Sequence, residues 1–250
     1  MIVALLLGRE GSIGFPRKNT TLVLGRPLMS YPLLAASAAK SVDKIFVSTD
    51  SENIKEIALK HGARVIDRPP ELATKEALGE DAYVHGYRYI SEQLGFRPEL
   101  MVLLFCNAAT ILPKTIDEGI DILLGDPSLD SAVTVSAYNM WSPLRARKEA
   151  PDGLLQPFVP FEAFGELKAI NCDRDSQGDV YFADMSVSIV RPRCLENLSY
   201  GQLPQRWMGR RIFPLKQWGG CDVDYAWQIP SVEYWLREHG FSKTKVPFNA

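Results

Sequence analysis

A glycine-rich turn near the start of the chain concentrates positive charge. It follows an apolar run over residues 2–7 and contains Gly8, Arg9, Gly11, Ser12, Gly14, Arg17, Lys18 and Asn19. Glycines allow backbone amides to point at an anion, and the cationic side chains supply charge. The spacing fits neither the GxxxxGK[ST] pattern of a P-loop nor the GxGxxG pattern of a dinucleotide-binding fold. The turn therefore predicts a polyphosphate site of another kind, such as a site for a nucleoside triphosphate.

A pair of carboxylates far along the chain is the second group that could do chemistry. Asp222 and Asp224 flank Val223, just before a predicted helix. Magnesium is usually held by one or two carboxylates together with substrate phosphates. The pair therefore predicts a site for Mg²⁺ bound to a nucleotide.

Each of these groups also has a purely structural explanation. The turn could be an ordinary strand-to-helix connection, although its length and its three cations in a slightly acidic protein favour an anion site. Asp222 and Asp224 could simply complement the dipole of the following helix, and the residues alone leave both explanations open. For Asp50, which ends a strand, a helix cap is favoured over contact with a ribose or a metal.

The elements that must position these residues alternate along the chain. Apolar strands are predicted over 2–7, 44–48, 64–66, 101–105 and 131–136, and helices over 28–40, 52–61, 80–94 and 113–124. This alternation predicts an α/β fold, a three-layer arrangement with a mostly parallel sheet covered on both faces. Ligands of such sheets bind beyond the carboxyl ends of the strands. The glycine turn, Asp50 and Asn107 should therefore line one crevice.

Residues 138–178 interrupt the alternation. This segment is rich in proline, phenylalanine and charge and has weak periodicity, so we expect an inserted lobe or arm within a single domain that spans residues 1–250. Strands over 181–190 and 211–215 and a final helix over 223–239, with Pro230 inside it, follow the arm. Ser51 and Gly62 should bound the helix over 52–61.

Composition restricts the classes of partner and compartment. The chain has 250 residues and a net charge of −2, which gives no reason to expect a nucleic-acid polymer as partner. Its four cysteines form no CxxC pair, which argues against a structural zinc site or a disulfide framework. We expect no signal peptide and no membrane span. The expected compartment is the cytoplasm.

Taken together and in this order, the motifs resemble the CMP-N-acylneuraminate (CMP-sialic acid) cytidylyltransferases, which are related to the CMP-Kdo synthetases. The resemblance lies in residues 8–19, 47–50, 68–73 and 222–224 and extends over nearly the whole chain. It implies a Rossmann-like nucleotidyltransferase fold with a small dimerisation lobe that reaches over the site of the partner in a homodimer. It also implies the reaction: CTP and a 2-keto sugar acid give a CMP-sugar and pyrophosphate, with Mg²⁺ as cofactor.

The resemblance further implies a role for individual residues. The triphosphate would be held by Gly8, Arg9, Gly11, Ser12, Lys18 and Asn19, and cytosine by Arg68 and the backbone near Ala77. Asp222 and Asp224 would bind Mg²⁺ and would form the catalytic set with Arg9 and Lys18. The small acidic sugar would be bound by Asn107, Arg145, Arg174 and Asp184.

The chain departs from the family pattern mainly where the acceptor sugar would bind. Phe105 stands in place of a glutamine that faces the sugar, and residues 182–184 replace an R-P-N motif. Nearer the nucleotide, Ile13 replaces a lysine and Gly79 a serine. Three alternatives therefore stay open: a different acid acceptor such as a Kdo-like sugar, a different nucleotide, and a non-catalytic nucleotide-binding protein.

Overall fold

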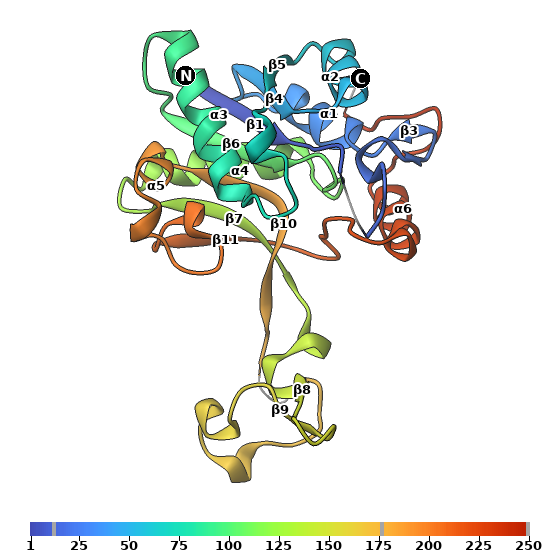
Figure 1. The fold of residues 1–250 in the computed structure, drawn as a ribbon, viewed down its shortest axis with the longest axis vertical. Coiled ribbons are helices and arrows are strands. Elements are labelled where there is room, and N and C mark those ends of the chain that lie inside the picture. Colours follow the sequence, from blue (N-terminus) through green and yellow to red (C-terminus); the bar gives the residue numbers. More distant parts are fainter. Residues whose placement is uncertain (12–13, 176–177, 249–250) are drawn as a thin grey trace.

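A seven-stranded sheet forms the centre of the computed structural model, which describes residues 1–11, 14–175 and 178–248. The strands are β1 (Ile2–Leu7), β4 (Lys44–Thr49), β5 (Arg64–Asp67), β6 (Leu100–Phe105), β7 (Ser131–Ala137), β10 (Tyr181–Val190) and β11 (Ile212–Gln217). Their order is β11-β7-β10-β6-β1-β4-β5, and only β10 runs antiparallel to its neighbours (Figure 1). The predicted mostly parallel α/β sheet is confirmed, and each predicted strand is present with ends that differ by at most two residues.

Helices cover both faces of this sheet. They are α1 (Ser30–Ala38), α2 (Glu52–Lys60), α3 (Gly79–Leu94), α4 (Pro113–Gly125), α5 (Pro192–Glu196) and α6 (Ile229–Glu238). Every residue of β1 is buried, and alternate residues enter different cores. Ala4 and Leu6 belong to the core that contains side chains of α1, α2 and α4, whereas Val3 and Leu5 belong to the core that contains side chains of α3 and α5. This double burial explains why the strand is apolar throughout.

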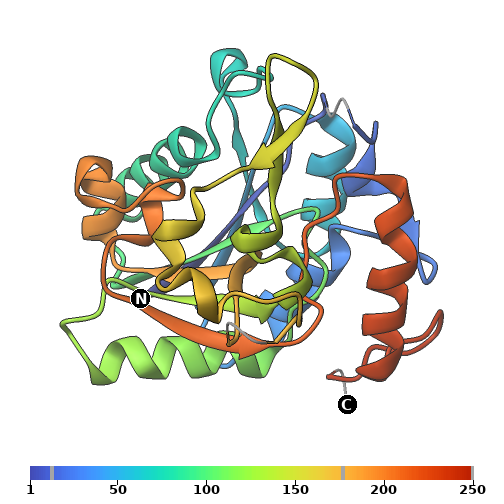
Figure 2. The same ribbon diagram turned by 90° about the horizontal axis from the view of Figure 1, so that it is seen from below.

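The final helix starts later than the sequence predicts. It begins at Ile229, with Pro230 in its first turn, because proline is tolerated there but not in a helix interior. Residues of α6 share a third core with residues of the segment 23–31, so α6 lies beside the segment that follows the glycine-rich turn (Figure 2). This packing carries the segment before α6 toward the glycine-rich turn.

The remaining elements are short, and most have too few residues to show a periodicity. They are strands β2 (Leu22–Val23) and β3 (Arg26–Pro27) and the 3-10 turns η1 (Lys18–Thr20), η2 (Pro70–Leu72), η7 (Leu198–Tyr200), η8 (Arg206–Met208) and η9 (Ala226–Gln228). The sequence predicted neither strand, and it also missed α5. Among all these helices of the described chain, none combines the length and hydropathy needed to cross a bilayer.

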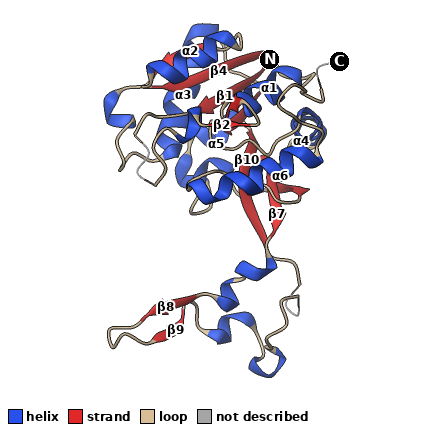
Figure 3. Cartoon of the chain, turned by 90° about the vertical axis from the view of Figure 1, so that its right-hand side faces the viewer, coloured by secondary structure: helices blue, strands red, loops and turns tan. Residues whose placement is uncertain are grey.

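An arm projects from the sheet where the lobe over 138–178 was predicted (Figures 1 and 3). Its base is the outer end of the β7–β10 pair, where Tyr181 lies opposite Ala137. Its elements are the hairpin of β8 (Arg147–Glu149) and β9 (Leu155–Pro157) and the turns η3 (Asn139–Trp141), η4 (Pro143–Arg145), η5 (Phe161–Phe164) and η6 (Leu167–Ala169). Leu154, Leu155 and Phe158 of the arm are more than half exposed.

Candidate active site

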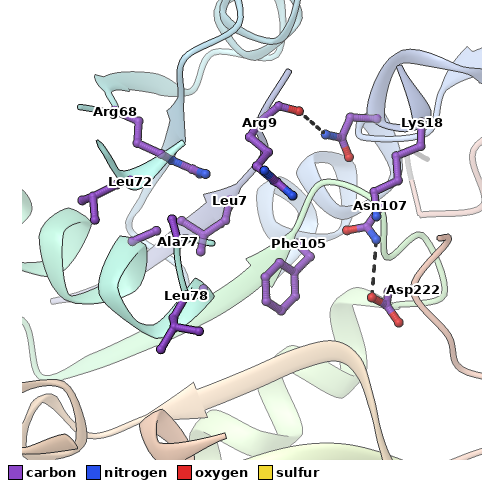
Figure 4. A pocket seen from close by; sticks show the side chains of 14 residues that line it. Leu7, Arg9, Lys18, Arg68, Leu72, Ala77, Leu78, Phe105, Asn107 and Asp222 are labelled. Atoms are coloured by element: carbon purple, nitrogen blue, oxygen red, sulfur yellow. Dashed lines mark hydrogen bonds between the residues drawn. The ribbon is translucent and has the colours of Figure 1, made fainter. Parts of the chain in front are cut away.

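A pocket lies at the carboxyl ends of the parallel strands, where the fold predicts it. It is lined by Leu7, Gly8, Arg9, Lys18, Asn19, Arg68, Leu72, Ala77, Leu78, Gly79, Ala82, Phe105, Asn107 and Asp222. Figure 4 shows Arg68, Leu72 and Ala77 at one end and Lys18, Asn107 and Asp222 at the other, with Arg9 between them. The pocket therefore joins residues that the sequence assigned to the base, the triphosphate and the metal.

Two arginines make the pocket electropositive. Arg68 is buried, and its guanidinium donates to the hydroxyl and the carbonyl of Ser48 at the end of β4. Arg9 donates to the carbonyls of Ala73 (3.3 Å) and Thr74 (2.8 Å). Neither arginine forms an ion pair with a carboxylate within residues 1–11, 14–175 and 178–248. Because no carboxylate pairs directly with either arginine in this part of the chain, their charge favours an anionic ligand.

The glycine-rich turn and the Asp-Val-Asp segment meet at this pocket, although more than 200 residues separate them. Lys18 Nζ lies 2.5 Å from Asp224 Oδ1. On the same side, a Cβ added at Gly14 would lie 3.0 Å from the carbonyl oxygen of Asp224, so the turn packs closely on that backbone. The sequence-based expectation that these two motifs come together is correct.

Close contacts hold the glycine-rich turn against the sheet. At Gly8 a Cβ would lie 2.8 Å from Sγ of Cys106, so only glycine allows this close approach. The carboxylate of Asp50 accepts the backbone N–H of Glu10 (3.0 Å), and the Ser51 hydroxyl donates to the Glu10 side chain. The expectation that Asp50 caps α2 was therefore wrong, and Ser51 takes the N-cap position without a capping side-chain bond.

Asp222 has the surroundings expected of a metal-binding carboxylate. Its burial, followed by the charge of Asp224, raises the pKa of Asp222 above its ordinary value. The amide of Asn107 donates to Asp222 (3.4 Å) and to the carbonyl of Val223 (2.9 Å), which fixes this segment on the end of β6. Two neighbouring carboxylates, of which Asp222 is half-buried and Asp224 is exposed, offer oxygen ligands to a cation, and a nucleotide would complete the oxygen ligands of Mg²⁺. The residues therefore fit this ion.

The end of the pocket that the sequence assigns to the base is lined by Arg68 and by apolar side chains. Leu72 and Leu78 line it together with Ala77, whose backbone N–H donates to Thr74 (3.3 Å to its carbonyl). Phe105 closes the adjoining wall, where its ring lies 5.4 Å from the ring of Tyr83. The two leucines were missed from the sequence, because apolar residues in a loop have no periodicity to signal their position.

The residues predicted to bind the acceptor are not brought together within one chain. Asn107 lies at the pocket, but Arg145 and Arg174 lie on the arm, where their guanidiniums bond to the Cys172 carbonyl (2.8 Å) and the Asp175 carboxylate (2.7 Å). Their role in binding an acceptor stays a prediction that requires a second copy of the chain. Gly11 is exposed and does not line the pocket, and Ser12 and Ile13 fall outside the described residues.

Asp184 is buried at the start of the arm and is engaged in a polar network. Its Oδ2 accepts from the Ser136 hydroxyl (2.8 Å) and the Gln217 amide (2.9 Å). Its Oδ1 accepts the backbone N–H of Ser186 (3.1 Å). A carboxylate with these partners supports the junction of β7, β10 and β11, and its predicted contact with an acceptor stays a prediction.

Comparisons with known proteins agree with the resemblance seen in the sequence. Residues 3–80 match the sequence profile of the cytidylyltransferase family. The chain is 32% identical over 124 residues to the N-acylneuraminate cytidylyltransferase of Oncorhynchus mykiss and 41% identical over 64 residues to the CMP-N,N'-diacetyllegionaminic acid synthase of Legionella pneumophila. These alignments cover 49% and 26% of the chain. They span about a quarter of the length of the curated relatives, 27% and 28% respectively.

The fold has close neighbours among solved structures. A CMP:2-keto-3-deoxy-manno-octonic acid synthetase solved with CTP superposes with a TM-score of 0.64 and 17% sequence identity. The superposition covers 95% of this chain and 99% of the synthetase. The chain therefore has the nucleotidyltransferase fold over nearly its whole length.

Proposed function

We propose that the protein is a cytidylyltransferase that converts CTP and a 2-keto sugar acid into a CMP-sugar and pyrophosphate. The observation that carries the proposal is the contact between Lys18 and Asp224 at the rim of the cationic pocket, because it joins the predicted triphosphate turn to the predicted metal ligands. The similarity to N-acylneuraminate and diacetyllegionaminate cytidylyltransferases supports an acidic nine-carbon sugar as acceptor.

The arrangement of the pocket suggests a role for each of these residues in the reaction. Cytosine enters the end beside Arg68 and Ala77, and the triphosphate extends past Arg9 toward Lys18. Asp222 and Asp224 would hold Mg²⁺, which would neutralise phosphate charge when bound. An oxygen of the acceptor attacks the α-phosphorus in line with the departing pyrophosphate. Transfers of this kind depend mainly on positioning and on charge stabilisation, which Arg9 and Lys18 provide for the leaving group.

The test of this function is a panel of nucleotides and acceptors. We expect pyrophosphate release with CTP in the presence of N-acetylneuraminate, Kdo or N,N'-diacetyllegionaminate, and at least about a tenfold lower rate with ATP, GTP or UTP, because the guanidinium of Arg68, held by its bonds to Ser48, presents fixed donors that distinguish bases. Release that needs no acceptor, or that is equal for all four nucleotides, would contradict the proposal. Stabilisation by CTP without any turnover would favour a nucleotide-binding protein instead.

We also propose a homodimer in which the arm contacts a second copy. The exposed apolar side chains of Leu154, Leu155 and Phe158 on a projecting hairpin support this, because burying them against another chain is favourable. Such a contact would bring Arg145 and Arg174 to the pocket of the partner. Sedimentation equilibrium should give a mass of two chains, and Leu155→Asp together with Phe158→Asp should give one. A wild-type monomer at micromolar concentration would contradict the dimer.

We place the protein in the cytoplasm. The four cysteines are all unpaired thiols in the structure, and free thiols persist in a reducing compartment.

A further inference from the structure

The two predicted metal ligands are anchored by different parts of the chain. Asp222 is fixed from the end of β6, where the Asn107 amide bonds to its carboxylate and the Asn107 carbonyl accepts the backbone N–H of Val223 (3.0 Å). The side chain of Val223 is fully buried in the core that α6 shares with the segment 23–31. The side chain of Asp224, by contrast, is 56% exposed, so packing does little to fix it. The position of Asp224 therefore depends on how its backbone is held.

Gln228, the last residue of η9, holds this backbone. Its side-chain oxygen Oε1 accepts the backbone N–H groups of Asp224 (2.7 Å) and Tyr225 (2.8 Å). Because both partners are donors, the amide must face them with its oxygen, which can accept two bonds. The backbone N–H of Gln228 donates in turn to the carbonyl of Tyr225 (3.1 Å). These bonds close the segment 224–228 into a compact loop.

The same loop packs on the glycine-rich turn. A Cβ added at Gly14 would lie 3.3 Å from Cε1 of Tyr225, in addition to its close approach to the carbonyl oxygen of Asp224. The ammonium of Lys18 reaches the carboxylate of Asp224 from the turn. A shift of the loop would therefore move a predicted metal ligand and also disturb the turn that is predicted to hold the triphosphate.

We propose that Gln228 is a positioning residue of the metal site, which holds the Asp224 carboxylate where Mg²⁺ would bind and keeps the loop 224–228 on the glycine-rich turn. The inference rests on the proposed cytidylyltransferase function and adds to it a residue that does not line the nucleotide pocket. Hydrogen-bond partners that orient metal ligands change metal affinity by about ten- to a hundredfold when they are removed. A neutral carbonyl suits this role, since it accepts both N–H groups without adding a charge that competes for the metal.

The test compares two substitutions of similar length. Gln228→Met removes the acceptor, whereas Gln228→Glu keeps an oxygen in the same place. Titration of Mn²⁺ in the presence of CTP should show about tenfold weaker binding for Gln228→Met, and at most about threefold weaker binding for Gln228→Glu. The Mg²⁺ concentration for half-maximal turnover should rise about tenfold for Gln228→Met, while kcat at saturating Mg²⁺ stays within about threefold of the wild-type value, because excess metal restores occupancy. Gln93→Met, which changes an exposed glutamine in the last turn of α3, is the control and should alter neither quantity.

Amide hydrogen exchange measures the anchor itself and needs neither metal nor turnover. Gln228→Met should speed exchange at the amides of Asp224 and Tyr225 by about tenfold or more, because each loses its acceptor. The amide of Val223, which is bonded to the Asn107 carbonyl, should stay within about twofold of its wild-type rate and serves as an internal control. Unchanged exchange at Asp224 and Tyr225 would rule out the anchor. Should Gln228→Met fail to fold, Gln228→Asn, which is one methylene shorter, carries the same expectations.

The outcomes separate this inference from the proposed function. A wild-type Mn²⁺ affinity in Gln228→Met, or a loss that Gln228→Glu shares, would overturn the inference while CTP-dependent turnover of the wild-type protein still supports the function. A lower melting temperature of Gln228→Met with unchanged Mn²⁺ affinity would make Gln228 a residue of the fold alone. If the wild-type protein binds Mn²⁺ with CTP but converts no acceptor, and Gln228→Met weakens that binding, the positioning role stands and the proposed reaction fails.

Discussion

Replacing Asp222 by asparagine is expected to lower kcat by at least about a hundredfold and to leave the fold intact. Asparagine has the same shape and keeps an oxygen for Asn107, so the segment before α6 should hold its position. What is lost is the negative charge of a half-buried side chain that lines the nucleotide pocket. Without it the bound metal would lose a ligand, and the phosphate charge would be poorly neutralised.

Two measurements check this expectation. Titration with Mn²⁺ in the presence of CTP should show weaker metal binding for Asp222→Asn, and thermal unfolding should show a melting temperature within a few degrees of the wild-type value. Asp121→Asn removes an exposed carboxylate on α4 and should change neither quantity. Unchanged turnover of Asp222→Asn at saturating Mg²⁺ would remove this residue from the metal site.

The parts of the site that come directly after the end of a strand could be predicted from the sequence. A continuous apolar run marks β1 because both faces of the strand are buried, and glycines mark the turn because a side chain at Gly8 would collide with Cys106. The general rule for parallel sheets then places Arg68 and Asn107 at the same edge. The structure brings both to the pocket.

Contacts between segments that lie far apart in the sequence could not be predicted, because no sequence pattern marks them. The bonds from Arg9 to the carbonyls of Ala73 and Thr74 involve backbone atoms, which any residue type could supply. A cavity beside Asp222 that is lined by rings such as Tyr138, Trp218 and Trp227 is assembled from the base of the arm, the loop after β11 and the segment around α6. Its rings occur singly in the sequence, so neither a period of two nor one of 3.6 reveals that they face one space.

Asp184 shows why position alone is a poor guide to role. The sequence places it where a family motif lies, and the structure does bring it to the wall of the cavity beside Asp222. Its burial and its bonds to Ser136 and Gln217 also give it a structural role that the sequence did not predict. A buried carboxylate is stable only where hydrogen-bond donors surround it. The sequence does not reveal which donors these are, because that depends on the register of the strands.

Replacing Lys18 by methionine is expected to change metal and nucleotide binding in opposite directions. In the ligand-free protein the ammonium of Lys18 lies 2.5 Å from Asp224, so it occupies a carboxylate that the metal needs. Methionine keeps the length of the side chain and removes the charge. Mn²⁺ alone should therefore bind Lys18→Met about tenfold more tightly, because no cation competes for Asp224. CTP should bind about a hundredfold more weakly, because a charged hydrogen bond to phosphate is lost.

Isothermal titration of Mn²⁺ without nucleotide, and of CTP with Mg²⁺, measures the two effects separately. Lys60→Met is the matched control, since it removes an exposed lysine that pairs with Glu56 on α2 and should alter neither affinity. If Lys18→Met weakened both ligands equally, Lys18 would serve only to shape the turn. Opposite changes would mean that the ammonium leaves Asp224 for the triphosphate when the metal enters, so that nucleotide and metal bind cooperatively through one side chain.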